Sequence, residues 1–507
     1  MKGITLPEYK EPPSPESYVP LGHPQCDGNP FIECISSHII NAPNFSAEVA
    51  VQLPTAPKNG VAVGGNPILA SLGMRQLPVA VYPTPILHRT NDRVLELHLL
   101  GLIDRNPLNS VEQNKRFHLL TTADPASLKE RVQTFNVGTP LSLFVMGTSG
   151  LGKTFGVQYC LARLPSKYRH TAYGGRTLDV LQVMYLYVSC PPTGTLKGLL
   201  FEILLALDLE LGTDFYTRWL NRYPSTDVLL INVCLILSSH SVGVLVLDEL
   251  QHLKARGYAE TEIQLNFFVA LMNFLRVPLI CIGTYAARKV IEGTLRDPRR
   301  LSGLGCIEFS RYEENDAITK AMENYYLGFL PMPPDRKEEA FLRSSVYDIY
   351  QGIHALLPNL VQRCAAEMAF RGLKHLTRDV LSYYQRVELK LLERPLEILR
   401  RRDPDAAQHY DDLVGPETLK EWRASQQKID TERVKQGQTW SPAATVTELS
   451  RTFEVEGFPC GHITDIAIAR EVKRTRAMFG DGDLYPAFKK QGLLADRILE
   501  GKLSSSA

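Results

Sequence analysis

Residues 147–154, GTSGLGKT, are the part of this chain best suited to hold phosphate groups. They match the pattern G-x-x-x-x-G-K-[ST] without a gap. Glycines let backbone N–H groups curl around an anion, and a following helix adds partial positive charge at its N-terminus. We expect Lys153 to reach the β- and γ-phosphates of ATP and the Thr154 hydroxyl to bind Mg²⁺. The expected nucleotide-binding residues are Gly147, Thr148, Ser149, Gly150, Leu151, Gly152, Lys153, Thr154 and Phe155.

An acidic pair follows a second apolar run. Residues 242–253 read VGVLVLDELQHL, a strand pattern that ends in Asp248 and Glu249. A continuous apolar run suits a strand buried on both faces of a parallel sheet. We expect Asp248 to hold the Mg²⁺ and Glu249 to orient and polarise the attacking water, so that the site hydrolyses ATP as well as binding it. The alternative is a helix N-cap, where carboxylates are also favoured.

Thr284 and a group of arginines are further catalytic candidates. Thr284 ends the run VPLICIGT, where we expect it to sense the γ-phosphate or the water; the alternative is a plain strand-to-helix turn. Arg296, Arg299 and Arg300 stand in EGTLRDPRRLSGLG, before a last strand-like run. We expect this edge of the domain to face away from its own nucleotide. Arg299 or Arg300 would then complete a neighbouring subunit's site as an arginine finger. For any single one of them, a solvated basic turn is the alternative.

Five strand-like runs must position these side chains. They lie at 141–146, 183–190, 242–248, 277–284 and 305–312, and segments with helical spacing separate them. This alternation predicts a doubly wound, five-stranded parallel α/β sheet. In such sheets ligands bind at the carboxyl ends of the strands, where the glycine turn, the acidic pair and Thr284 are placed.

The composition limits the possible classes of protein. A chain of 507 residues predicts two or three domains. Lys plus Arg number 56 against 55 for Asp plus Glu, so contact with nucleic acid requires a local basic patch. Nine cysteines, an odd count, favour reduced thiols. The N-terminus lacks the apolar core of a signal peptide, and no apolar run is long enough to cross a bilayer, so we expect a cytoplasmic protein.

The motifs and their spacing resemble an AAA+ ATPase, and several stretches are similar to the TnsC family of ATPase regulators of Tn-seven-type transposons, including CRISPR-associated relatives. The similarity runs from about residue 28 to past residue 370, with a fainter match in GDLYPAFKKQGLL near the C-terminus. The Walker motifs alone are unspecific, whereas the combined block is specific. The similar stretches are GNPFIE (28–33), GLIDRNP (101–107), VLVLDELQHL (244–253), LNFFVALMNFLRVPLICIGT (265–284) and the LRDPRR turn.

The resemblance implies a DNA transposition regulator of the bacterial cytoplasm. Such proteins bind ATP, assemble head to tail as a ring or filament on duplex target DNA of any sequence, and accept a TnsD- or TniQ-like target selector. They then recruit and activate TnsA- and TnsB-like transposase subunits, and ATP hydrolysis dismantles them. Head-to-tail contacts are heterologous and give rings or helical filaments. Two alternatives remain: a helicase loader or DNA-repair AAA+ ATPase, and an oligomerising signalling NTPase that acts as a scaffold.

The resemblance also predicts the domains. We expect a partner-binding N-terminal extension at 1–125, an AAA+ α/β core at 126–330, a small helical lid at 331–390, and a helical linker with a transposase-docking tail at 391–507. In the lid, the position expected for a basic sensor holds Pro358 or Asn359, one turn before Arg363. Either Arg363 substitutes or the second sensor is missing.

Residues for DNA contact are placed in two loops near the face that lines the channel of ring ATPases. We expect Thr195 and Lys197 in one loop, and Lys254 and Arg256 in the other, to bind the DNA backbone. Ordinary solvated surface is the alternative for each. Arg400–Arg402 form a further basic run with the same two interpretations.

A Cys/His set lies near the N-terminus. His23, Cys26, Cys34 and His38 have the outer spacing of a zinc site, although the central gap of seven residues is short for a zinc finger. Because GNPFIE lies inside this set and matches the N-terminal motif of the resembled family, we favour the interpretation without zinc.

Overall fold

In the computed structural model the chain divides into two compact units, Met1–Pro416 and Glu417–Ala507. Of the second unit the structure describes the helix α20, Pro416–Lys435, which begins at the boundary. Among the described residues no helix has the length and apolar character needed to cross a membrane. The structure describes residues 13–35, 37–40, 45–56, 66–113, 141–253, 268, 276–288, 303–410 and 412–435.

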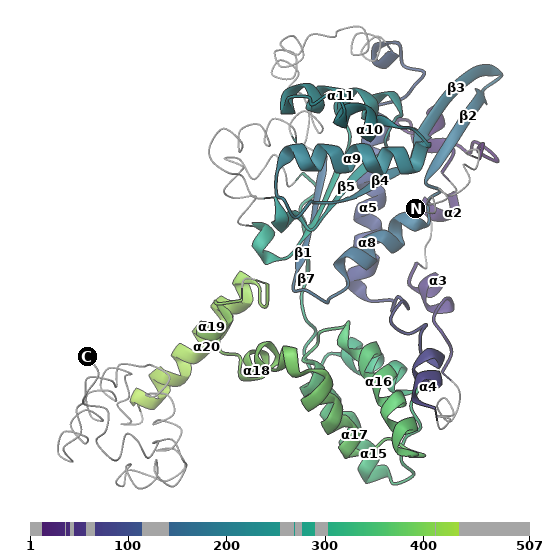
Figure 1. Ribbon diagram of the computed structural model, residues 1–507. Helices are drawn as coiled ribbons and strands as arrows, with labels where there is room; N and C mark the ends of the chain where they lie inside the picture. Colours follow the sequence, from purple (N-terminus) through teal and green to yellow (C-terminus); the bar gives the residue numbers. More distant parts are fainter. Residues whose placement is uncertain are drawn as a thin grey trace. The chain divides into compact units, whose positions relative to one another are not determined.

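A five-stranded parallel sheet forms the centre of the first unit (Figure 1). Its strand order is β4-β5-β6-β1-β7, and each strand corresponds to one of the five apolar runs, so the predicted AAA+ α/β fold is confirmed. The run 183–190 is divided between two strands: Val183 ends the preceding strand β3, and β4 starts only at Tyr185. The strands are β1 (Ser142–Gly147), β4 (Tyr185–Ser189), β5 (Val244–Asp248), β6 (Leu279–Gly283) and β7 (Cys306–Phe309).

The sheet register brings the functional ends of three strands to one edge. In β1, Ser142 pairs with Leu279 of β6 and Phe144 pairs with Cys306 of β7. In β5, Leu245 also pairs with Leu279. Because all these strands run in the same direction, the glycine turn after β1, the acidic pair after β5 and Thr284 after β6 lie at the same edge.

Helices cover both faces of the sheet (Figure 1). On one face, α9, α10 and α11 pack against apolar side chains of β4, β5 and β6. On the other face, α5 and α8 pack against β1, β5, β6 and β7. Every residue of β5 and of β6 is buried, as expected for central strands of a parallel sheet. These helices are α5 (Pro85–Ile103), α8 (Lys153–Ala162), α9 (Leu196–Leu211), α10 (Phe215–Leu220) and α11 (Thr226–Ser239).

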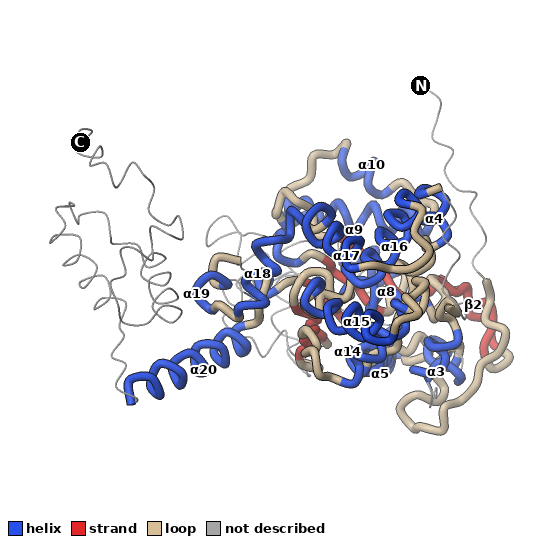
Figure 2. Tube along the Cα trace, turned by 90° about the horizontal axis from the view of Figure 1, so that it is seen from below, coloured by secondary structure: helices blue, strands red, loops and turns tan. Residues whose placement is uncertain are grey.

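A β-hairpin that the sequence reading missed is inserted between α8 and β4. Its strands β2 (Lys167–Tyr173) and β3 (Arg176–Val183) are antiparallel and project from the sheet in Figure 1, and β2 lies at the margin in Figure 2. A buried polar network joins the base of the hairpin to the N-terminal segment. His170 Nε2 lies 2.8 Å from Gln182 Oε1, and the Tyr18 hydroxyl lies 2.8 Å from His170 Nδ1. This network ties Tyr18 of the N-terminal segment to the hairpin.

In the part of the N-terminal region that the structure describes, four short helices precede α5, which is anchored to the sheet. At the end of α5, Arg105 donates hydrogen bonds to the carbonyl oxygens of Gly101 at 2.7 Å, of Gly243 at 2.9 Å, and of Val242. Two of these bonds tie the C-terminal end of α5 to the residues that precede β5. The short helices are α1 (Pro30–Glu33), α2 (Ser37–Ile40), α3 (Phe45–Val51) and α4 (Pro67–Gly73).

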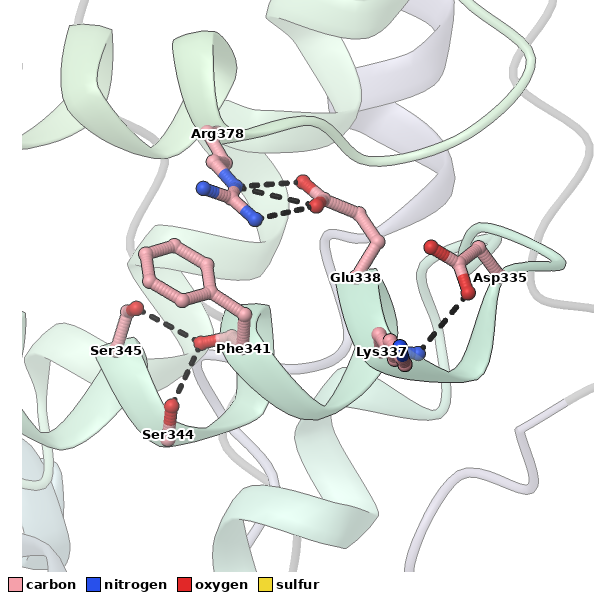
Figure 3. A network of polar contacts seen from close by, with 7 residues as sticks. All are labelled: Asp335, Lys337, Glu338, Phe341, Ser344, Ser345 and Arg378. Carbon is pink, nitrogen blue, oxygen red and sulfur yellow. Dashed lines mark hydrogen bonds and ion pairs between the residues drawn. The ribbon is translucent and has the colours of Figure 1, made fainter.

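A helical lid follows the sheet, and α14 is the first helix after β7. Arg378 joins α17 to α15 through a bidentate ion pair with Glu338, and its guanidinium lies 3.8 Å from the ring centroid of Phe341 (Figure 3). The π-helical segment η4 continues α17. The remaining elements are α14 (Ala317–Leu327), α15 (Arg336–Tyr350), α16 (Leu356–Arg371), α17 (Arg378–Tyr383), η4 (Tyr384–Glu388), η5 (Lys390–Leu392), α18 (Glu393–Arg401) and α19 (Pro404–Ala407).

Candidate active site

The glycine turn after β1 has a backbone that only glycine adopts without strain. Gly147 has φ +151°, and an added Cβ would lie 2.1 Å from the Phe309 carbonyl oxygen of β7. Gly152 has φ +86° and is the N-cap of α8, which begins at Lys153. The first amides of a helix have no partner within it, so this turn presents N–H groups and the positive end of a helix dipole to an anion.

Lys153 is held inside the turn. Its side chain is 8% exposed, and its ammonium group donates to the Thr148 carbonyl oxygen at 2.8 Å. Burial lowers the pKa of Lys153, while the carboxylates of Glu249, Asp248 and Asp412 raise it. An ammonium group that has lost most of its hydration gains more from binding phosphate than an exposed one does.

Two oxygen ligands for a divalent cation lie together at the start of α8. The Thr154 hydroxyl donates to Asp248 Oδ2 at 2.8 Å, and the Tyr187 hydroxyl of β4 donates to the same oxygen. Burial and the bond to Asp248 raise the pKa of Tyr187, so this phenol stays a hydrogen-bond donor. Hydroxyl and carboxylate oxygens are the ligands that Mg²⁺ prefers, so these residues fit the cation implied by the fold.

Glu249 and Thr284 are joined through Gln251, which the sequence reading did not consider. The Gln251 amide donates to Glu249 Oε2 and accepts from the Thr284 backbone N–H at 3.2 Å. The hydroxyl oxygen of Thr284 is buried and has no hydrogen-bond partner among the described residues. A buried hydroxyl group without a partner is costly, so a ligand that supplies one is favoured there.

These groups line a cavity of about 540 Å³, which lies in the size range of small-molecule sites. Its phosphate end is built by the glycine turn, Asp248, Glu249, Gln251 and Thr284. Its other walls come from the N-terminal region and the lid. The sequence analysis did not predict these wall residues. The residues of those walls are Pro78, Ala80, Val81, Tyr82, Thr84, Leu87, Met322, Tyr326, His354, Ala355 and Pro358.

The lid contributes no arginine to the described lining of this cavity. Pro358, at the expected sensor position, does line it. Arg363 instead lies 3.8 Å from Glu388. Ala355 binds the glycine turn directly, because its backbone N–H donates to the Gly150 carbonyl oxygen at 2.9 Å.

The proposed DNA-contacting residues divide between described and undescribed segments. The Thr195 hydroxyl caps α9 by accepting from the Gly198 N–H at 3.1 Å. The Lys197 ammonium group is exposed and donates to the Pro224 carbonyl oxygen at 2.8 Å. Lys254 and Arg256 lie outside the described residues, and so do the finger candidates Arg299 and Arg300 with their neighbour Arg296.

Two further candidate clusters are occupied by structural contacts. Arg400, Arg401 and Arg402 each form an ion pair, with Asp348, Glu397 and Glu313 respectively. In the Cys/His set, the Cys34 thiol donates to the Phe31 carbonyl oxygen at 3.3 Å, and burial raises its pKa to about 12. Within the described ranges, no group of three His, Cys, Asp or Glu residues is arranged to hold a metal ion.

Comparisons with known proteins give the class. Residues 137–291 match the family model described as an AAA domain. The Walker-type ATPase of Pyrococcus abyssi aligns at TM-score 0.33 with 14% identity, over 61% of this chain and 89% of that chain. The Aeropyrum pernix ORC2 protein, in ADPNP and ADP complexes, aligns at 0.33 with 15% identity, over 63% and 86%. Drosophila ORC bound to DNA aligns at 0.30 with 12% identity, over 69% and 85%. No curated protein sequence matches.

The protein is a P-loop ATPase with an AAA+ α/β fold. The site described above explains the activity in physical terms. Lys153 and the amides of the glycine turn are suited to bind the phosphates, and Thr154 with Asp248 to hold the cation. Bound Mg²⁺ would neutralise charge on the phosphate oxygens. Glu249 follows Asp248 directly, has φ +55°, and accepts a hydrogen bond from the Gln251 amide.

Proposed function

We propose that this ATPase regulates target selection in DNA transposition. It assembles head to tail on duplex target DNA, links a target selector to the transposase and activates insertion, and ATP hydrolysis drives its disassembly. The observation that carries the proposal is the block from 244 to 284, in which VLVLDELQHL, LNFFVALMNFL and VPLICIGT together resemble the TnsC family. The Walker motifs alone would fit many other ATPases.

The charge of the cavity supports a site completed by a neighbouring subunit. Among the described residues that line it, Lys153 is the only lysine or arginine, against the carboxylates of Asp248, Glu249 and Asp412. Phosphoryl transfer develops charge that P-loop ATPases neutralise with a second cation, often an arginine supplied in trans. Arg299 or Arg300 of the next subunit is our candidate, which makes hydrolysis depend on assembly.

Electron microscopy with duplex DNA and a non-hydrolysable ATP analogue tests the assembly directly. We expect rings or filaments that require both DNA and the analogue and that form on any sequence. Assemblies that form without DNA would favour the signalling scaffold instead. A helicase loader or repair ATPase would assemble on DNA but would fail to stimulate a transposase supplied with it.

Mixing variants tests the arginine finger. Arg299→Ala or Arg300→Ala should bind ATP and fail to hydrolyse it, because fingers contribute about 10³- to 10⁵-fold in rate. Mixed with Glu249→Gln, which offers an intact finger and a dead site, the finger variant should recover part of its activity. Arg394→Ala, at an exposed lid arginine, is the matched control and should hydrolyse normally. Absence of recovery in co-assembled mixtures contradicts a trans-acting role.

DNA contact is tested through salt dependence. Each phosphate contact contributes about −0.9 to the slope of log affinity against log salt. Lys254→Ala or Arg256→Ala should flatten the slope by about one unit per subunit and weaken all sequences alike. Lys374→Ala, at an exposed lid residue, should leave it unchanged. Deleting the tail at 461–507 should spare ATP-dependent DNA binding and abolish transposase activation.

A further inference from the structure

A short segment between α19 and α20 lies on the phosphate end of the cavity. This segment, residues 412–415, contacts the ends of two central strands. The Leu413 carbonyl oxygen accepts from the Thr148 hydroxyl at 3.0 Å, within the glycine turn. The Asp412 carboxylate accepts from the Ala286 backbone N–H at 3.4 Å, two residues beyond Thr284. Both contacts join residues that are far apart in the sequence.

The 412–415 segment packs closely against Tyr285 and Glu308. An ideal Cβ on Gly415 would lie 2.8 Å from the Tyr285 hydroxyl and 2.8 Å from Glu308 Oε1. These two side chains are themselves hydrogen-bonded at 2.6 Å. Leu413 and Val414 are each 7% exposed. The segment is therefore packed onto the strand ends rather than lying loosely over them.

Asp412 lines the cavity on the side of the reacting phosphate. Lys153, Glu249 and Thr284 line the same cavity, and the bond from Ala286 places the Asp412 carboxylate close to Thr284. The Asp412 charge acts on Lys153, whose pKa it raises against the larger, lowering effect of burial. In this state the carboxylate of the segment therefore interacts with the cation that a terminal phosphate would need.

The two other acids at this end have roles that Asp412 does not share. Asp248 is bonded to Thr154 as a cation ligand, and Glu249 is joined to Gln251. Asp412 is an additional negative charge beside the place where the third phosphate of ATP must fit. Like charges at such short range repel strongly in a partly buried site. ADP, one phosphate shorter, meets less of this repulsion.

We propose that Asp412 discriminates against the third phosphate, so that the 412–415 segment stays seated with ADP and is displaced when ATP binds. Because the segment leads directly into α20, its release signals the nucleotide state to the unit Glu417–Ala507. Coupling of this kind is reciprocal, so a partner that holds α20 in the released state must also increase the affinity for ATP. The proposal requires nucleotide in the cavity and is independent of the role in transposition.

Nucleotide titration of the full chain tests the charge. Asp412→Asn keeps the acceptor for Ala286 and removes the charge. We expect it to bind a fluorescent, non-hydrolysable ATP analogue about tenfold more tightly and to bind fluorescent ADP as before, within the range usual for coupled sites. Asp379→Asn removes the same charge from an exposed lid position and should change neither affinity. Equal effects on both nucleotides, or weaker binding of the ATP analogue, would overturn the proposal.

Hydrogen exchange tests the displacement itself. Amides in peptides spanning 412–420 should exchange faster in wild type with the ATP analogue than with ADP. In Asp412→Asn the exchange rate of these amides should reach its ATP-bound value at a lower concentration of the analogue. Identical exchange with both nucleotides overturns the proposed release and leaves the ATPase assignment intact. Failure of the wild type to bind ADP overturns the cavity assignment as well.

Discussion

Replacing His98 by leucine should remove an acid-sensitive weak point in the fold. His98 lies on α5 and is fully buried, and neither of its ring nitrogens has a hydrogen-bond partner among the described residues. Burial, reinforced by the neighbouring Arg105 guanidinium, lowers its pKa from 6.5 to about 3. The folded protein therefore keeps this imidazole neutral at pH values where an unfolded chain would protonate it.

The sign and size of the effect follow from linkage. Above pH 6.5 neither state binds the proton, and the stability contribution is fully present. As the pH falls from 6.5 towards 3, the unfolded state alone takes up the proton, and stability is lost. Between pH 7 and pH 5 this loss amounts to about 2 kcal/mol. For the unit Met1–Pro416, with an unfolding entropy of about 2.1 cal/mol/K per residue, that corresponds to a shift in Tm of about 2 °C.

Thermal unfolding at pH 7 and pH 5 measures the effect. The Tm of His98→Leu minus that of wild type should increase by about 2 °C on going to pH 5. His354, whose pKa burial lowers to about 4, is present in both proteins and cancels in the difference. His375→Leu, at an exposed position, should follow the wild type in parallel. If His98→Leu also runs parallel to wild type, His98 is not the neutral buried group described here.

Three other substitutions test the site and its support. Gln251→Leu should lower kcat about tenfold with little change in KM, because Glu249 loses the amide that positions it, and steady-state ATPase assays measure this. Tyr187→Phe should raise the Mg²⁺ concentration for half-maximal ATPase activity about tenfold, because Asp248 loses an orienting bond; an unchanged Mg²⁺ titration would contradict that role. Gly243→Ala places a Cβ 2.2 Å from a backbone oxygen and should destabilise the fold by about 1–3 kcal/mol, seen as a lower Tm.

The sequence predicted the parts of the site that carry a local signature. The glycine turn, with the Asp248–Glu249 pair, combines a fixed spacing with an apolar strand before it, and both signals act over about ten residues. Tyr187 and Asp412 have no such signature. Tyr187 reads as an ordinary residue of a buried strand, and Asp412 reaches the cavity only because a segment 265 residues beyond Thr148 folds back, as the Leu413 contact shows.

The hairpin was missed although its signal is present. KYRHTAY and RTLDVLQV are separated by Gly174 and Gly175, the pattern of a two-residue hairpin turn. A regular alternation of strands and helices contains no place for an inserted hairpin, so that pattern alone does not predict it. The attachment of Tyr18 to the hairpin depends on a tertiary contact, which no local pattern reports.

The strand order also has a consequence for synthesis of the chain. The hairpin β2–β3 can form as soon as it emerges, but β1 pairs only with β6 and β7, and Ser142 waits for Leu279, 137 residues later. At ribosomal rates of about 5–20 residues per second, that delay is roughly 7–27 s. During this time the apolar strand SLFVMG has no sheet neighbour. Nascent chains should therefore depend on chaperones until β6 and β7 have been made, and stalling before residue 279 should expose β1 to aggregation.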